Sequence, residues 1–266
     1  MMKSVITVCI VVNIALLFIS CQVRAPYVAG YYNLVNEQTV FIETVDTAKA
    51  AGCVEAGLVK GEASEVCEML MQSLPDIHGK YVGTGTFIRH EGKIRVLTAE
   101  HVCFPDEVPD TVERGTVVIQ VEKTTEITVA SGKFRAEAKI IKKDKSLDLC
   151  ILELSEQPLV RTPVFSLYSP KRGDFVFYGG APYGMISENF MLVYDGYYSG
   201  KMHNNMIFSL PCASGASGSS IRNEKNEIIS MVQKVHTGFN HICYGVSTEA
   251  LRDFVFGKES SKSLLK

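Results

Sequence analysis

The sequence predicts an all-β protein made of two six-stranded antiparallel barrels, with a helical hairpin before them and one helix after them. Between residues 80 and 154, short apolar runs and period-two alternation indicate about six strands, the number that closes a small barrel. A second set of six strand signals lies between residues 175 and 246, and residues 158–163 separate the two sets as a linker bounded by prolines. Residues 43–74 and 251–256 instead show the apolar spacing of helices.

The composition is that of a globular protein with one large domain or two small ones. The chain has 266 residues, of which 46% are hydrophobic and 21% charged, and its formal net charge is −2. Because no block of basic residues is available to neutralise phosphates, nucleic acid is not expected as a partner. The chain has no Cys-x-x-Cys or His-x-x-x-His spacing, so neither a metal nor another cofactor is expected. The composition does not predict an oligomeric state.

Residues 1–21 are expected to be a secretory signal rather than part of the fold. The short positive start contains Lys3, and an almost wholly apolar stretch follows at residues 5–19. Cys21 comes directly after this stretch and a serine, which looks like a bacterial lipobox and implies lipidation of Cys21 and a membrane tether. The alternative is ordinary cleavage near residues 23–25. Either way the protein is expected to be exported, as a periplasmic or cell-envelope lipoprotein or as a secreted protein.

Six of the eight cysteines lie beyond this signal, and an oxidising compartment would allow them to form up to three disulfides. They are Cys53, Cys67, Cys103, Cys150, Cys212 and Cys243. Their pairing cannot be deduced from the sequence. Cys53 and Cys67 form the best local pair, because a helical hairpin would bring them together.

Residues 22–77 are interpreted as an N-terminal helical extension. One apolar stripe runs from Val45 to Leu58 and a second from Val66 to Leu74, with Gly61 as the break between them. The simpler role of such a hairpin is to cover one barrel or to space the barrels from a membrane. The alternative is an inhibitory pro-segment that is removed.

The strand signals define a first barrel at residues 78–157 and a second at residues 164–256. The first set comprises Lys80–Ile88, Ile94–Thr98, Thr116–Glu122, Glu126–Ala130, Phe134–Ile141 and Asp148–Leu154. The second comprises Phe175–Tyr178, Met191–Tyr198, Met206–Ser209, Ser219–Arg222, Ile228–Gln233 and His241–Val246. Leu251–Phe256 is expected to be a helix that docks on a barrel, and the polar tail at residues 257–266 to be disordered.

The run Ser214-Gly215-Ala216-Ser217-Gly218-Ser219-Ser220 contains only small residues and cannot form a core strand or a stable helix. A linker or a surface turn would explain it. A nucleophile loop would explain it too, because glycine lets the backbone turn its N–H groups toward a developing oxyanion. In that interpretation Ser217 is the nucleophile, and it requires a base and a carboxylate from elsewhere in the chain.

The chain contains a candidate for each partner. His101 ends an apolar strand, and histidine suits both proton uptake and proton release. Asp148 lies inside an apolar run, where a buried carboxylate needs a partner such as His101 Nδ1. The competing carboxylate is Asp144, which lies between two lysines in what reads as a solvated charge cluster.

The order His, Asp, Ser resembles that of the trypsin-like (chymotrypsin-fold) serine proteases, in their bacterial branch of HtrA-type and glutamyl endopeptidases. The resemblance covers about residues 80–256. It rests on Gly83-Thr84-Gly85-Thr86-Phe87-Ile88, on Val96-Leu97-Thr98-Ala99-Glu100-His101-Val102, on the Gly-x-Pro-x-Gly turn at 180–184, and on the segment 218–229 after the proposed nucleophile.

This resemblance implies a secreted or membrane-tethered serine endopeptidase that acts on protein or peptide substrates through an acyl-enzyme intermediate. His101, Asp148 and Ser217 would form the triad, and the N–H groups of Gly215 and Ser217 the oxyanion hole. At Ala216 the chain departs from the digestive proteases, which have an aspartate there. The activation of those enzymes through an ion pair with a new N-terminus is therefore not expected.

The resemblance also places Cys212 and Val232 in the substrate pocket, which would make the pocket modest and apolar. Lys234 or His236 could attract an acidic substrate side chain, and no residue suggests a preference for Lys or Arg. The alternative function is a catalytically silent binding or structural protein on the same fold. An esterase on another fold would need a helix after the nucleophile, whereas residues 218–233 are predicted to be strands.

Overall fold

The computed structural model describes residues 34–55, 77–104, 111–114, 117–188, 190–236 and 238–258, together with residues 69, 71 and 261. The expected signal sequence at residues 1–21, including Cys21, lies outside the described residues, as does most of the tail at residues 257–266. None of the helices in the described part is long and apolar enough to cross a membrane.

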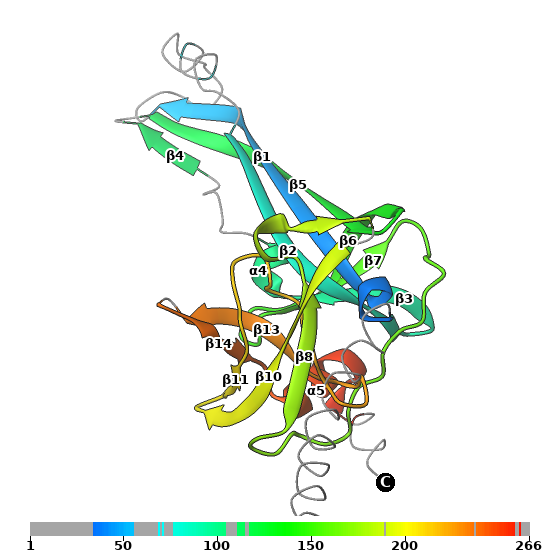
Figure 1. The fold of residues 1–266 in the computed structure, drawn as a ribbon. Coiled ribbons are helices and arrows are strands. Elements are labelled where there is room, and N and C mark those ends of the chain that lie inside the picture. The colour runs from blue at the N-terminus through cyan, green and yellow to red at the C-terminus, as the bar shows by residue number, and fades with distance from the viewer. Residues whose placement is uncertain are drawn as a thin grey trace, which may run out of the picture.

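Within the described residues, six antiparallel strands close the first barrel (Figure 1). Their order is β1 (Thr39–Glu55), β2 (Ile77–His90), β3 (Lys93–Thr98), β7 (Leu149–Leu154), β6 (Phe134–Asp144) and β5 (Val117–Ser131). The pairing of β5 with β1 closes the ring, and β4 (Thr111–Arg114) pairs with β5. The short helix α4 (Glu100–Cys103) follows β3.

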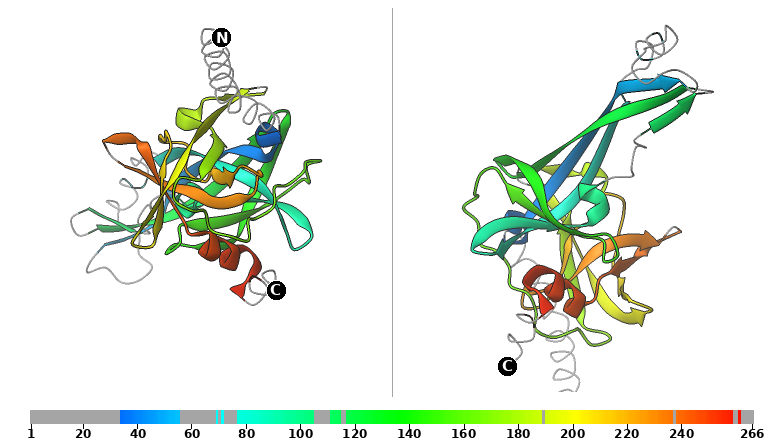
Figure 2. Two further views of the ribbon diagram at one scale, coloured as in Figure 1. Left: turned by 60° about the horizontal axis from the view of Figure 1, so that its bottom comes forward. Right: turned by 180° about the vertical axis from the view of Figure 1, so that it is seen from behind.

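The second barrel is also closed by six antiparallel strands. Their order is β11 (Asn205–Ser209), β14 (Phe239–Gly245), β13 (Ile228–His236), β12 (Ser220–Asn223), β8 (Phe175–Gly180) and β10 (Phe190–Met202). Pairing of β10 with β11 closes this ring, and β9 (Ile186–Ser187) pairs with β10. The turn η1 (Pro182–Gly184) follows β8, and α5 (Thr248–Phe256) ends the described fold (Figure 2). The prediction of two six-stranded barrels with a C-terminal helix is confirmed.

The strands follow from period-two patterning of apolar and polar side chains. In β6, Ala136 and Ala138 are buried while the intervening Glu137 is exposed, as expected for a strand with one face in a core. The hairpin between β2 and β3 turns at Glu91 and Gly92, which both have positive φ, the conformation that suits a two-residue hairpin loop.

The helical hairpin expected at residues 43–74 is wrong in its first half, because residues 39–55 form the strand β1. Val40, Ile42 and Thr44 alternate into the core, and β1 pairs with β2 on one edge and with β5 on the other. This pairing with distant segments outweighs the helical spacing further along the strand. The expected second helix and the Cys53–Cys67 pair fall mainly outside the described residues.

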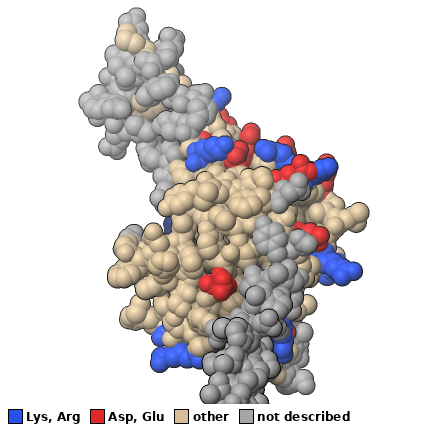
Figure 3. All heavy atoms as spheres, in the orientation of Figure 1, with Lys and Arg blue, Asp and Glu red and all other residues tan. Residues whose placement is uncertain are grey.

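The first barrel also obtains its sixth strand differently from the prediction. The stretches 116–122 and 126–130, predicted as two strands, belong to the single strand β5, and β1 takes the remaining place in the ring. Together with β2 and β4, these long strands extend away from the barrels as a twisted arm (Figures 1 and 2). On the face drawn in Figure 3, Lys and Arg lie among Asp and Glu rather than in one positive patch, and a broad uncharged area adjoins them.

Candidate active site

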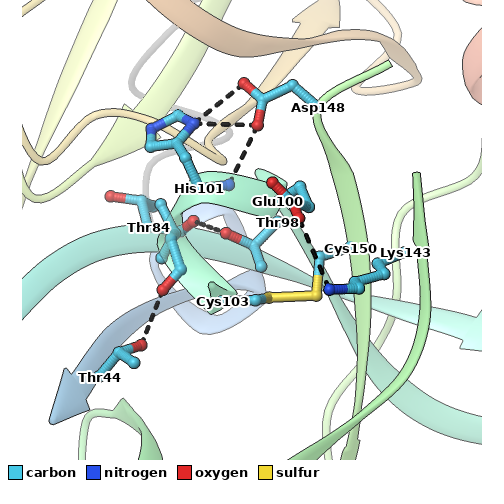
Figure 4. The surroundings of a disulfide bond; sticks show 10 residues. Thr44, Thr84, Thr98, Glu100, His101, Cys103, Lys143, Asp148 and Cys150 are labelled. Carbon is cyan, nitrogen blue, oxygen red and sulfur yellow. Dashed lines mark hydrogen bonds and ion pairs between the residues drawn. A yellow bond between two sulfur atoms is a disulfide. The ribbon is translucent and has the colours of Figure 1, made fainter. Parts of the chain in front are cut away.

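His101 and Asp148 are brought together by two neighbouring strands of the first barrel. His101 lies in α4 just after β3, Asp148 lies just before β7, and Thr98 of β3 pairs with Cys150 of β7. His101 Nδ1 lies 2.9 Å and 3.0 Å from the two Asp148 carboxylate oxygens, and the His101 backbone N–H donates to Oδ1 at 3.1 Å (Figure 4). The His101 side chain is 48% exposed and that of Asp148 only 16%, so the carboxylate is sheltered while the imidazole reaches solvent.

Asp144, the competing carboxylate, is engaged in its own turn. Its Oδ1 accepts hydrogen bonds from the Ser146 hydroxyl at 2.6 Å, from the Ser146 N–H at 2.9 Å and from the Leu147 N–H at 3.0 Å. These bonds, the hydroxyl first, lower the pKa of Asp144 below its ordinary value. The turn ends at Asp148, whose φ of 50° is in the left-handed region, and it directs that carboxylate to His101.

A disulfide ties the same two segments together. Cys103 follows His101 by two residues, Cys150 follows Asp148 by two residues, and the pair is bonded and fully buried (Figure 4). The helix that carries the imidazole is therefore covalently linked to the strand that follows the carboxylate. The sequence left this pairing open.

Ser217 lies in the loop between β11 and β12, and its backbone docks against the first barrel. The Thr84 N–H donates to the Ser217 carbonyl at 2.9 Å. A Cβ atom at Gly218 would lie 2.0 Å from the Thr84 carbonyl oxygen and 2.2 Å from Thr98 Oγ1, so the loop packs directly on the end of β3 that leads to His101. No hydrogen bond joins Ser217 Oγ to His101 among the described residues; in ligand-free enzymes such contacts often tighten only when substrate binds.

The N–H groups of Gly215 and Ser217 have no acceptor among the described residues. The N–H groups of Ala216, Gly218 and Ser219 all donate to backbone carbonyls, whereas those of Gly215 and Ser217 do not. The Ala216 carbonyl accepts the Ser219 N–H at 3.0 Å. Because the N–H and C=O of a trans peptide point in opposite directions, the Ser217 N–H is directed away from that bond.

The Gly215 N–H is oriented in the same manner by its own peptide. The Ser214 carbonyl accepts the Tyr183 N–H at 2.7 Å, which turns the Gly215 N–H to the other side. Gly215 has a φ of 90°, and a Cβ atom there would lie 2.6 Å from the Ala181 carbonyl oxygen. Only glycine fits this position, and its N–H, like that of Ser217, is left without an acceptor among the described residues.

The residues expected in the substrate pocket are placed on the second barrel. Cys212 and Val232 are buried in its core, and Cys212 forms a disulfide with Cys243. Lys234 is exposed on β13. Their role in a pocket stays a prediction. No cluster of three or more His, Cys, Asp or Glu side chains suited to a metal occurs in the described part of the chain.

Two residues at this site were not identified as functional candidates from the sequence. Thr84 makes hydrogen bonds to the Ser217 loop from the first barrel, and the Gln233 side-chain amide donates to the carbonyl of Leu147, next to Asp148. Thr84 stands in the Gly-Thr-Gly segment of β2, a signal that could have singled it out. Gln233 carries no such signal, because nothing in its local pattern indicates a contact with the other barrel.

Comparison with known proteins identifies a trypsin-like peptidase domain in this chain. The family model of the trypsin-like peptidase domain matches residues 83–231, a span that includes His101, Asp148 and Ser217. No curated protein matches the sequence.

Among solved structures, the chain is similar to Rv3671c from M. tuberculosis H37Rv in the inactive form of a serine-to-alanine mutant. The identity is 16%, the match covers 90% of this chain and 92% of the other, and the TM-score is 0.54. The active form of the Rv3671c protease from M. tuberculosis matches 88% of this chain and 86% of its own, with 16% identity and a TM-score of 0.55. At this identity the likeness shows a shared fold.

Proposed function

Because the chain belongs to the trypsin-like peptidase family and is a serine peptidase of that kind, we propose that it is an exported endopeptidase that cleaves protein or peptide substrates through an acyl-enzyme on Ser217. The observation that carries the proposal is the His101–Asp148 pair, which adjoins a serine loop in which the N–H groups of Gly215 and Ser217 are unengaged. The protease activity of the structurally similar Rv3671c is consistent with it.

Each group has a defined task in the proposed mechanism. With Nδ1 bound to Asp148, the imidazole of His101 has Nε2 free to take the Ser217 proton as the hydroxyl attacks the substrate carbonyl. The N–H groups of Gly215 and Ser217 receive the oxyanion of the tetrahedral intermediate. His101 then returns the proton to the leaving amine, and a water molecule releases the acyl group by the same steps in reverse.

The loop that would form the oxyanion hole holds its shape without an activating ion pair. Ala216 is fully buried in the apolar core of the second barrel, where the digestive proteases resembled by this chain have an aspartate. The surrounding peptides are held by backbone hydrogen bonds instead. We therefore propose that activity does not depend on a newly formed N-terminus, in keeping with the HtrA-type and glutamyl branch.

Export is supported by the two buried disulfides, which form and persist in oxidising compartments. We propose that lipidation of Cys21, in its lipobox-like sequence, tethers the protein to a membrane. A Cys21→Ser variant should then be released from the membrane fraction, and continued membrane association would contradict lipidation.

For specificity, buried Cys212 and Val232 favour a shallow apolar pocket, and exposed Lys234 would favour acidic groups at its rim.

The decisive experiment is labelling with a fluorophosphonate, combined with hydrolysis of a peptide library. Wild-type protein should be labelled and should cleave peptides, and Ser217→Ala should do neither while keeping its circular dichroism spectrum. Ser214→Ala is the matched control, because it removes an exposed hydroxyl from the same loop and should retain both activities. Labelled Ser217→Ala protein would identify another nucleophile. A folded wild-type protein that is never labelled would favour the catalytically silent binding protein instead.

A further inference from the structure

Thr84 makes two hydrogen bonds from the first barrel to the serine loop. It lies in β2 and is fully buried. Its hydroxyl donates to the Gly215 carbonyl at 2.7 Å and accepts the Ala181 N–H at 3.0 Å. Its backbone N–H donates to the Ser217 carbonyl at 2.9 Å, and its carbonyl accepts the Thr98 hydroxyl at 2.7 Å (Figure 4).

The direction of the Thr84 hydroxyl bond is determined by its neighbours. A hydroxyl has one proton, and the Ala181 N–H can only donate, so the proton of Thr84 is left for the Gly215 carbonyl. On the other side of the same peptide, the Ala216 N–H donates to the Ala213 carbonyl at 3.0 Å. The Gly215–Ala216 peptide is thus held at both of its polar ends.

This peptide is the spacer between the two proposed oxyanion donors. The N–H of Gly215 precedes it and the N–H of Ser217 follows it, so its orientation sets the angle at which the two donors converge. Gly215 has no side chain to restrict rotation about its own backbone. The hydrogen bond from Thr84 therefore supplies a restraint that the local sequence cannot.

We propose that Thr84 is a positioning residue for the oxyanion hole, and that its hydroxyl, supplied by one barrel, fixes the donor peptides of the other. The inference rests on the proposed function, because it concerns the same site. The backbone bonds of Thr84 to Ser217 and Thr98 survive any substitution of its side chain. Replacement of the side chain therefore tests the hydroxyl alone.

The test compares Thr84→Val with Thr86→Val. Thr86 is two residues further along β2 and is equally buried, and its hydroxyl also donates across to the second barrel, to Ser220 Oγ at 2.8 Å. The two variants lose the same group from the same strand, but only Thr84→Val loses a bond to the Gly215–Ala216 peptide between the proposed donors. We expect Thr84→Val to lower kcat about 10- to 100-fold with little change in KM, somewhat less than deletion of an oxyanion donor. Thr86→Val should stay within about threefold of wild type, since its hydrogen bond has no part in the donor geometry.

A second readout isolates the oxyanion hole. A peptidyl trifluoromethyl ketone forms a hemiketal with the nucleophilic serine and places its oxyanion in the hole, so its affinity should weaken in parallel with kcat in Thr84→Val. Thr84→Ser should restore both values. If Thr84→Val does not fold, as judged by its thermal transition, Thr84→Ala replaces it, because the smaller side chain leaves room for water beside the Gly215 carbonyl.

Two negative results have different meanings. An active wild type in which Thr84→Val and Thr86→Val behave alike in both readouts would overturn the positioning role alone. A folded wild type that neither hydrolyses peptides nor binds the ketone covalently would overturn the proposed function, and the inference with it.

Discussion

Asp148 holds His101 at two points, the imidazole Nδ1 and the backbone N–H. The carboxylate therefore orients both the ring and the short helix that carries it. Asp144, four residues earlier, uses its carboxylate only to build the preceding turn. At the scale of single residues, the carboxylate of Asp148 therefore accepts from His101, whereas that of Asp144 accepts from its own turn. The same substitution at the two positions should have different effects.

Asp148→Asn should lower kcat/KM by about 10⁴-fold, because an amide can donate to Nδ1 and select the wrong imidazole tautomer. Asp144→Asn is the matched control and should retain activity within about threefold of wild type, since its amide oxygen can still accept the hydrogen bonds of the turn. Steady-state hydrolysis and the rate of fluorophosphonate labelling measure both effects. Comparable losses in the two variants would contradict the assignment of Asp148 as the partner of His101.

At the scale of elements, the neighbouring strands β3 and β7 explain how residues far apart in the chain come to share one site. Their antiparallel pairing brings His101 and Asp148 to the same edge of the barrel, and the Cys103–Cys150 disulfide closes the unit two residues further on. The bond links α4 to β7 directly. Its removal should loosen the His–Asp pair as well as the barrel.

The double variant Cys103→Ala/Cys150→Ala should lose about 2–4 kcal/mol of unfolding free energy in urea titrations. It should also broaden or lose the downfield proton signal of His101 Nδ1–H in NMR spectra, because α4 is no longer tied to β7. Cys212→Ala/Cys243→Ala is the control; it removes a disulfide from the second barrel, so it should lose stability but keep that signal. An unchanged signal in the first variant would show that the pair does not depend on the disulfide.

The barrels were predictable from the sequence because most strands show alternation of apolar and polar residues. The strand β1 was not predictable in this way. Residues such as Val45 and Ala48 also fit a helical stripe, and the strand is decided by pairing of β1 on both edges with β2 and β5. The same limit applies to the candidate site. His101 and Asp148 could be paired by their chemistry and order, but the hydrogen bonds of Thr84 and Gln233 exist only once two barrels are in contact.

At the scale of the whole molecule, contacts between the barrels hold the parts of the site in place. The segment before β1 makes one such contact: Val35 packs against Phe177 and Met191 of the second barrel, and the chain then enters the first. Gln38, directly before β1, accepts a hydrogen bond from the buried guanidinium of Arg222 in β12. The segment thus bridges the two barrels on its way into β1.

Arg222 makes this bridge energetically demanding. Its guanidinium is fully buried, burial lowers its pKa, and its partners among the described residues are the neutral groups of Gln38, Asn226 and Ser220. Its Nη2 has no hydrogen-bond partner among the described residues. Because this buried cation has so few acceptors, the loss of any one of them leaves another of its N–H groups unpaired.

Gln38→Ala should therefore lower the free energy of unfolding by about 1–3 kcal/mol, because it deprives a charged buried donor of an acceptor. Gln157→Ala is the matched control, since the Gln157 amide bonds only the neutral backbone of Ile94. Its cost should be about 1 kcal/mol or less. Urea titrations at neutral pH measure both values. Near the unfolding midpoint, Gln38→Ala should hydrolyse less peptide than wild type, because a larger fraction of it is unfolded. Equal costs would show that the guanidinium finds another acceptor, such as water, and that residue 38 does not join the barrels through Arg222.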